Sequence, residues 1–569
     1  MNNRQAQLLL ILLSTAALMW LLAGCGDETD DVTSVGGTGI SVSVVATASN
    51  LDTGQVVGVK AVVSGASKAG ELSYSWIADD GTFGDSESDS TSWTAPDAPG
   101  VYALSAIVTD GEKVGIGKVN VAVASYLPID SPFYRGAEAC SVCHTSGPGG
   151  DQFVTWSTTR HAGAMKTLRD IGQGRNAVCQ GCHTVGTYGV NADPDLDNGG
   201  YDETAVARLE GVQCENCHGP GSEHPSPDFG SVAISLAAEV CGSCHDESHH
   251  PTYTEWSQSA HGSGTVAFAA GRASCAKCHN GVEGPRYLDD PAGYTNLPAD
   301  PTEIVAHTCP TCHDPHSNEN PHQLRNASVQ DVVLPNAVIV ENAGAGRLCM
   351  NCHNGRRQDY DVLAQLTDGS THFGPHHSVQ GDMLAGVNAY EQVNPSFTFA
   401  SSKHLLVEDG CVHCHTHAHE ADPISGSSTF TGHTFEPTVE ACQECHGPVQ
   451  DFIDIIAKQD YDGNGLVQGV QIEVAGLKDL LQETIIVNSS SPANEQLLRD
   501  DFEINIGDIT ISTLQQREAG YNWAYVDFDG SSGVHNTTYA VQLLQQSILY
   551  IDPGALPSSA YVVLQYESK

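Results

Sequence analysis

The stretch Cys214-Glu215-Asn216-Cys217-His218 holds the pattern that decides the fold: two cysteines three positions apart, followed at once by a histidine. Eighteen of the 19 cysteines in this 569-residue chain fall into nine copies of C-x-x-C-H, and the other cysteine is Cys25. From the Cys and His frequencies, chance would produce roughly 0.03 copies. The motifs, numbered in chain order, are Cys140/Cys143/His144, Cys179/Cys182/His183, Cys214/Cys217/His218, Cys241/Cys244/His245, Cys275/Cys278/His279, Cys309/Cys312/His313, Cys349/Cys352/His353, Cys411/Cys414/His415 and Cys442/Cys445/His446.

This pattern is typical of covalent haem c attachment, in which both cysteines form thioethers to the haem and the histidine is a proximal iron ligand. Zinc sites and C-x-x-C disulfides are the alternatives for an exported chain. Neither explains why a histidine follows the second cysteine all nine times. The sequence therefore predicts a nonahaem cytochrome with nine proximal histidines.

The second axial ligands must come from the rest of the chain. Of 26 histidines, 26 − 9 = 17 are not proximal, whereas methionines are few, so we expect two histidines on every iron and low potentials. The candidate distal ligands are His161, His224, His261, His316, His376, His377, His404, His433 and His535.

Several of these histidines lie in segments that resemble known cytochromes. Trp156 to His161 and Trp256 to His261 form an internal repeat, and Gly211 to His224 resembles the tetrahaem cytochromes of the hydroxylamine-oxidation pathway. That resemblance implies that His161, His224 and His261 are distal ligands. In Cys312-His313-Asp314-Pro315-His316, the last histidine is similar to those that ligate a neighbouring haem in multihaem chains.

The end of the chain resembles the pentahaem ammonia-forming nitrite reductases, in which long helices with a late ligand histidine follow the haem motifs. His433 and the stretch Gly533-Val534-His535-Asn536 carry this resemblance. The catalytic C-x-x-C-K motif of those enzymes does not occur in the sequence. The resemblance therefore implies ligands but not the catalytic haem of that family.

The sequence predicts a mixed multidomain fold. Residues 1–24 resemble a lipoprotein signal peptide, because an apolar run ends in Leu22-Ala23-Gly24-Cys25, which implies lipidation of Cys25. Residues 25–39 are predicted to be a flexible linker, and 40–125, with period-two alternation, to be an all-β sandwich similar to immunoglobulin-like or polycystic-kidney-disease repeats. The expected remainder is a loop-rich, mainly helical nonahaem region at 135–450 and a helical tail at 451–569.

The tail contains a candidate calcium loop. Asp460-Tyr461-Asp462-Gly463-Asn464-Gly465 resembles the first half of an EF-hand or dockerin loop, which implies ligands from Asp460, Asp462, Asn464, Leu466 and Gln471. A glutamine stands where a bidentate glutamate is usual. The alternative is an ordinary Asx-Gly turn that opens the following helix.

Charge limits the partners. With 24 basic and 69 acidic residues, the formal net charge is −45, which excludes nucleic acid as a general partner. The motifs and the lipid anchor resemble outer-membrane multihaem cytochromes of metal-reducing bacteria. This implies a respiratory electron carrier, rather than an enzyme with its own substrate site, at the outer membrane, cell surface or periplasmic face. Its partners would be other redox proteins and extracellular acceptors such as metal oxides.

Two other functions stay open. One is an oxidoreductase acting on a small nitrogen or sulfur compound at one five-coordinate haem. The other is a subunit of a cytochrome filament. The first requires one motif without a distal histidine, and the second requires ligation across subunits.

Overall fold

The computed structural model divides into two compact units, Met1–Ser125 and Tyr126–Lys569, which are described separately. The expected signal peptide, Cys25 and the linker lie outside the described residues. No helix in the described part of the chain combines the length and apolar character needed to cross a membrane. The described residues are 40–47, 50–51, 53–66, 72–78, 80–97, 100–111, 113–123, 133–147, 150–189, 200–224, 235–246, 250–296, 304–325, 331–356, 359–420, 428–489 and 492–563.

The smaller unit contains two four-stranded sheets, in the orders β1-β3-β6-β5 and β2-β8-β7-β4. Neighbouring strands are antiparallel except β2 and β8, and both sheets contribute to one core that includes Trp93 of β6 and Leu104 of β7. The immunoglobulin-like assignment stays a prediction. The strands are β1 Ser41–Ala46, β2 Asn50–Leu51, β3 Val56–Ser64, β4 Ser73–Ile77, β5 Thr82–Phe83, β6 Ser90–Thr94, β7 Gly100–Thr109 and β8 Val114–Val123.

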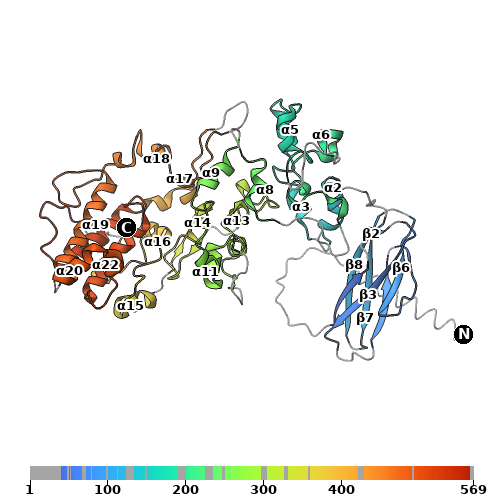
Figure 1. The fold of residues 1–569 in the computed structure, drawn as a ribbon, viewed down its shortest axis with the longest axis horizontal. Coiled ribbons are helices and arrows are strands. Elements are labelled where there is room, and N and C mark those ends of the chain that lie inside the picture. The colour runs from blue at the N-terminus through green and yellow to red at the C-terminus, as the bar shows by residue number, and fades with distance from the viewer. Residues whose placement is uncertain are drawn as a thin grey trace, which may run out of the picture. The chain divides into compact units, whose positions relative to one another are not determined.

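The motif-bearing part of the larger unit consists of short helices joined by long loops, with a two-stranded ribbon of β9 (Val332–Val333) and β10 (Ile339–Val340) (Figure 1). All nine motifs begin on short helices. These are α2 Ala137–His144, α5 Ala177–His183, α7 Cys214–His218, α8 Ala238–Gly242, α11 Ala273–His279, α13 Cys309–Cys312, α14 Arg347–Met350, α17 Cys411–His415 and α18 Val439–His446. The helices between them are α3 Gln152–Trp156, α4 Ala164–Asp170, α6 Tyr201–Thr204, α9 Thr252–Gln258, α10 Ala267–Ala270, α12 Glu283–Asp289, α15 Asp359–Asp368 and α16 Gln380–Ala385.

The C-terminal part is a bundle of longer helices, drawn in orange to red in Figure 1. Helix α19 (Val470–Val487) buries Val474, Leu477, Leu481 and Ile485, as their helical spacing predicts. It packs against α22 (Leu514–Asp529) and α23 (Thr537–Ile551), with α20 (Pro492–Asp500) and α21 (Phe502–Asn505) beside them. This is the largest of the hydrophobic clusters among the described residues.

Both ends of α22 are fixed by local chemistry. Thr513 and Gln516 form a reciprocal capping box at its start, and Gly530, at φ 74°, ends it in the left-handed conformation that suits glycine. The helix is buried over most of its length, so the residues that follow it have a defined position. His535 lies in this following segment.

We expect Leu477→Ala to destabilise the C-terminal bundle by about 2–5 kcal/mol, because the substitution opens a cavity at a fully buried position. Denaturant unfolding of the holoprotein, followed by far-ultraviolet circular dichroism, measures this change. Leu466→Ala is the control, because Leu466 is 62% exposed and should change the free energy of unfolding little. Equal effects of the two substitutions would contradict the packing described here.

Candidate functional site

Each motif lies on about one helical turn. Residues three apart share a helix face, so the two cysteines of a motif point the same way and the following histidine extends from the end of the turn. In α7, for example, Cys214 and Cys217 are one turn apart and His218 is the last helical residue. This arrangement suits a planar macrocycle attached along one edge.

Cys445 of motif 9 differs from the other motif cysteines. Its side chain is exposed, whereas the remaining seventeen are partly buried. Nine identical motifs suggest nine equivalent attachment sites, and the structure corrects that expectation at Cys445. The physical reason is its place on α18, the last motif helix, which packs against α17 on one side and leaves this cysteine toward solvent. Attachment of haem at Cys445 stays a prediction, and such a haem would have one edge near the surface.

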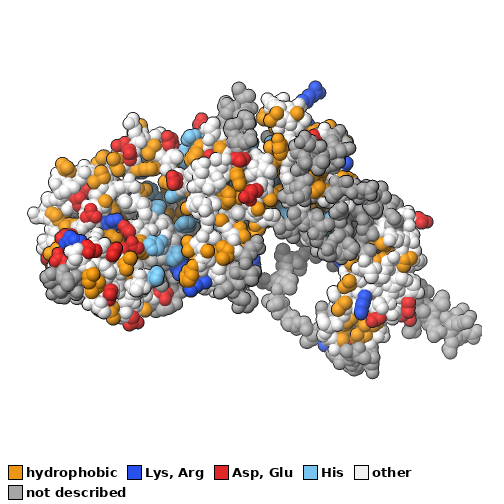
Figure 2. All heavy atoms as spheres, in the orientation of Figure 1, with side chains coloured by type: hydrophobic (Ala, Val, Ile, Leu, Met, Phe, Trp, Pro, Cys, Tyr) orange, Lys and Arg blue, Asp and Glu red, His pale blue; other side chains and the backbone are white. Residues whose placement is uncertain are grey.

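Eight of the nine proximal histidines face a second imidazole. The side chains involved gather across the middle of the larger unit, where Figure 2 shows a group of pale blue histidines. The ring centroids of these pairs are 5.9–6.5 Å apart. The pairs are His144–His224, His218–His316, His279–His376, His313–His433, His353–His261, His415–His535 and His446–His404, together with His245, which faces both His161 and His250.

These separations fit an iron bound between the rings. Two metal–nitrogen bonds of about 2 Å each, with the ring radius on either side, place the two centroids roughly 6 Å apart. Two hydrogen-bonded or packed imidazoles would not need to repeat this spacing beside every C-x-x-C pair. The residues present therefore fit covalent haem c with two histidine ligands at these eight motifs.

His183 of motif 2 is the ninth proximal histidine. Its Nδ1 bonds to the carbonyl of Ala164 at 2.9 Å, which fixes the ring. In the described part of the chain, the ring contacts bring no second imidazole opposite His183. His161, the candidate nearest to motif 2 along the chain, faces His245 instead.

Hydrogen bonds to Nδ1 orient many of the other rings, which leaves Nε2 to face the metal position. Backbone carbonyls accept from Nδ1 of His313 (His322, 2.7 Å), His415 (Phe435, 2.8 Å) and His404 (Val534, 2.9 Å). A hydroxyl, that of Ser378, bonds to Nδ1 of His376 at 2.5 Å. The ring orientations are therefore set by the polypeptide itself.

Burial also prepares the imidazoles for metal binding. Desolvation, with smaller contributions from nearby histidines, lowers the pKa of His245, His261 and His313 to about 4. These rings are neutral at pH 7, which is the form that binds a metal.

Two buried carboxylates position ligand-bearing segments, and the motif patterns gave no signal for either. Asp529, the last residue of α22, has a fully buried side chain whose Oδ1 is 2.7 Å from Nδ1 of His535. Burial lowers the pKa of His535, but Asp529 outweighs this effect and the pKa is raised. Glu255 accepts hydrogen bonds from the backbone N–H groups of Thr431 and His433 at 2.9 Å each, and so anchors the loop that carries His433.

The structure thus places eight of the nine candidate distal histidines opposite a proximal one. His377 is the exception: it stacks on Phe528, with ring centroids 3.7 Å apart, and its Nε2 is 4.0 Å from Glu503. Two histidines that the sequence analysis did not single out lie beside paired rings. His250 faces His245, and His307 lies 5.9 Å from His261 while its Nε2 bonds to the carbonyl of Cys278.

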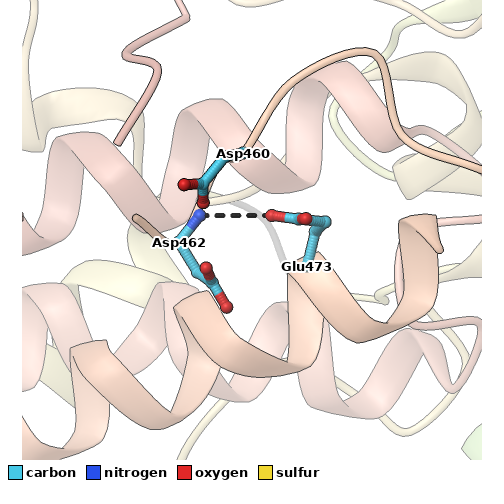
Figure 3. Close-up of side chains that lie close together, drawn as sticks. All are labelled: Asp460, Asp462 and Glu473. Carbon is cyan, nitrogen blue, oxygen red and sulfur yellow. Dashed lines mark hydrogen bonds between the residues drawn. The ribbon is translucent and has the colours of Figure 1, made fainter. Parts of the chain in front are cut away.

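The acidic loop before α19 brings Asp460 and Asp462 together with Glu473, as Figure 3 shows. Oxygen atoms of the three carboxylates lie within 4.8 Å of one another. Burial, followed by the neighbouring acids, raises the pKa of Asp462. All three carboxylates also accept backbone N–H groups, including Gly463 on Asp460 at 2.7 Å and Tyr461 on Glu473 at 2.7 Å.

The remaining residues expected in this loop have other contacts. Gln471 donates from Nε2 to the carbonyl of Ser531 at 3.2 Å, and the buried carboxylate that completes the group belongs to Glu473, two residues later. Asn464 Oδ1 accepts from the N–H of Leu466 at 2.9 Å, and the Leu466 side chain is exposed. The loop is closed by Asx-type hydrogen bonds whether or not it binds a cation.

The motif region matches proteins that are already known. A family described as cytochrome c554 and c-prime matches residues 139–219. Cytochrome c-554 of Nitrosomonas europaea is 34% identical over 113 residues, which are 17% of this chain and 41% of that protein. The C-type polyheme cytochrome OmcB of Geobacter sulfurreducens is 25% identical over 210 residues, which are 34% of this chain and 27% of that protein.

The structural similarities are more distant. The outer cell wall cytochrome OcwA has a TM-score of 0.40 at 20% identity, over 66% of this chain and 76% of that one. An undecaheme cytochrome from the S-layer of Carboxydothermus ferrireducens has a TM-score of 0.45 at 19% identity, over 75% of this chain and 70% of that one.

The aligned stretch spans only about a quarter of OmcB and less than half of cytochrome c-554. The Geobacter polyheme cytochrome OmcC aligns over more of this chain, 76%, at 23% identity. The nine motifs, the facing imidazoles and these relatives agree on the protein class, and the chain is a multihaem c-type cytochrome.

Proposed function

We propose that this protein relays respiratory electrons at the outer membrane or cell surface, through nine covalently bound haems, to extracellular acceptors such as metal oxides. The observation that carries the proposal is that eight proximal histidines face a second imidazole. A haem with two histidine ligands supplies one-electron transfer without an open position for substrate, at the low potential that such ligation favours.

The polypeptide contributes rigidity and charge to this function. The Nδ1 hydrogen bonds and the buried carboxylates keep each ligand ring in one orientation, so little rearrangement of these side chains is needed when the charge of a site changes. A net charge of −45 favours encounter with basic redox proteins or cationic acceptors, at rates that fall with ionic strength. Lipidation of Cys25 would hold the protein at the membrane.

A second candidate function is reduction or oxidation of a small nitrogen or sulfur compound at motif 2. His183 is oriented by the Ala164 carbonyl, whereas the nearest candidate ligand along the chain, His161, lies opposite His245. An iron held by His183 with an open second position would bind such a compound. This candidate concerns one motif and is compatible with electron relay by the other eight.

Low-temperature EPR of the oxidised protein, with spins counted against total haem, separates the two functions. We expect eight low-spin haems from the facing pairs. A ninth low-spin haem would leave relay as the only function. A high-spin signal that disappears in Cys179→Ala/Cys182→Ala and shifts with nitrite or hydroxylamine would favour the enzyme. More than one high-spin haem would contradict the pairing of histidines described above.

We expect Asp529→Asn to raise the midpoint potential of the motif 8 haem by about 30–60 mV, where 59 mV is a tenfold change for one electron. The buried carboxylate makes His535 a stronger donor and adds negative charge beside the site, and both effects stabilise the oxidised form. Spectroelectrochemical titration of the purified protein measures the shift.

Asp527→Asn is the matched control. It lies on the same helix and removes the same charge, but its carboxylate pairs with Lys478 and does not contact a ligand histidine in the described contacts. An identical shift in both variants would mean that net charge alone is responsible, and no shift in Asp529→Asn would show that the Asp529 contact does not tune His535.

The calcium loop stays a prediction, and chelation tests it. If Ca²⁺ binds at Asp460, Asp462 and Glu473, excess chelator should lower the Tm, because the cation offsets repulsion among these acids. Asp460→Asn should then lower the Tm in calcium and abolish the effect of the chelator. An unchanged Tm with chelator would leave an Asx-Gly turn closed by hydrogen bonds.

A further inference from the structure

The motif helices contact one another out of chain order. Helix α2 of motif 1 packs against α7 of motif 3, and motif 2 is passed over. Backbone N–H groups at the start of α2 donate into motif 3 and the residue before it: Ala137 to Gln213 Oε1 at 2.5 Å and Gly136 to Glu215 Oε2 at 2.7 Å. Motifs 1 and 3 are therefore neighbours in space.

The same skip occurs again further along the chain. Helix α8 of motif 4 packs against α13 of motif 6, and motif 5 is passed over. Helix α14 of motif 7 then packs against α17 of motif 8, which in turn packs against α18 of motif 9. These contacts give three stretches of adjacent motifs: 1 with 3, 4 with 6, and 7 with 8 and 9.

Motif 5, which is passed over, packs against motif 7. The sulfur of Cys278 lies 3.9 Å from the Asn351 carbonyl oxygen, inside motif 7, and Tyr287 donates to the same oxygen at 3.0 Å. In the opposite direction, Arg356 reaches the sulfur of Cys275 at 4.0 Å.

An internal repeat predicts the same placement for motif 2. Trp156 and Trp256 each donate from Nε1 to the carbonyl two residues before the first cysteine of the next motif but one, Val212 at 3.1 Å and His307 at 2.9 Å. The hydroxyl of the residue three positions after each tryptophan bonds back to the tryptophan carbonyl, at 2.7 and 2.6 Å.

The histidine five residues after each of these tryptophans then faces a proximal histidine two motifs beyond the motif that follows it. His161 faces His245 of motif 4, and His261 faces His353 of motif 7. Motifs 2, 3 and 4 are therefore repeated as motifs 5, 6 and 7, so motif 2 should pack on motif 4 as motif 5 packs on motif 7.

The cysteine thiols support these adjacencies and supply the missing links. Cys309 of motif 6 is the largest cause of the raised pKa of Cys241, which burial and Cys217 of motif 3 raise further. At the equivalent position in the repeat, Cys349 has a pKa raised by Cys411 of motif 8, by burial and by Cys312 of motif 6. Cys182 of motif 2 lowers the pKa of Cys244. These sulfurs are thioether sulfurs once haem is attached, so the shifts serve here only to show which motifs are close.

We propose that the attachment sites form a single row in the order 1-3-4-6-7-8-9, with site 2 attached to the side of site 4 and site 5 to the side of site 7. Motif 3 also contacts the chain near motif 2, because Asn216 donates to the Thr184 carbonyl at 2.9 Å. That contact involves the segment beyond motif 2 and not its cysteines. The row rests on the proposed function only in taking all nine sites to hold haem.

Two double substitutions distinguish this order from a row that follows the chain. Cys275→Ala/Cys278→Ala removes side site 5, and Cys309→Ala/Cys312→Ala removes row site 6, with the loss of one haem checked by mass. We expect single-molecule conductance of the full-length holoprotein to fall by more than an order of magnitude without site 6 and to stay close to the wild-type value without site 5. Equal losses in both variants would overturn the branched order.

A second measurement does not depend on either variant folding or on conduction. In the fully reduced wild-type protein, nuclear Overhauser contacts between haem methyl groups should join sites 1 and 3, 4 and 6, and 8 and 9. Contacts joining sites 1 and 2, or 5 and 6, in their place would overturn the proposal. A wild-type protein that does not conduct but shows the expected methyl contacts would contradict the relay function and leave the order of sites intact.

Discussion

The architecture of the larger unit depends on paired imidazoles that lie about one iron apart. Each pair joins a motif to a histidine elsewhere in the chain, as His313 joins His433 and His415 joins His535. The loops between the motif helices bury few apolar side chains of their own, and the clusters in this region are small. Closing these loops through metal bonds, and covering them with haem, replaces the ordinary hydrophobic core, so folding should depend on haem insertion.

The C-terminal bundle is stabilised in the usual way and also orients the ligands of the last sites. Its core is built from the buried faces of α19, α22 and α23, and this core fixes the end of α22. From that point Asp529 holds His535, and the carbonyl of Val534 holds His404. One packed element therefore positions ligands for two different motifs, which a flexible tail could not do.

The sequence predicted local features well and pairings poorly. Nine motifs, the period of α19 and a late histidine at position 535 can all be found within short windows. The partner of each proximal histidine cannot, because it depends on how segments far apart in the sequence pack. His376 and His377 are adjacent and chemically identical, yet only His376 faces His279, because the following ring lies on Phe528. The exposure of Cys445 is hidden in the same way, since its motif is identical to the other eight. Asp529 had no recognisable motif, because its role arises only where α22 ends.

The duplicated tryptophan-to-histidine unit, with its matching hydrogen bonds at Trp156 and Trp256, makes the reach of such a cytochrome a quantity that evolution can change in whole steps. Each unit brings three motifs, two in line and one at the side. Adding or deleting a unit of roughly a hundred residues would lengthen or shorten the molecule by two in-line stations and leave both ends unchanged. Relatives with different motif counts would then differ in span while keeping the same terminal surfaces for donors and acceptors.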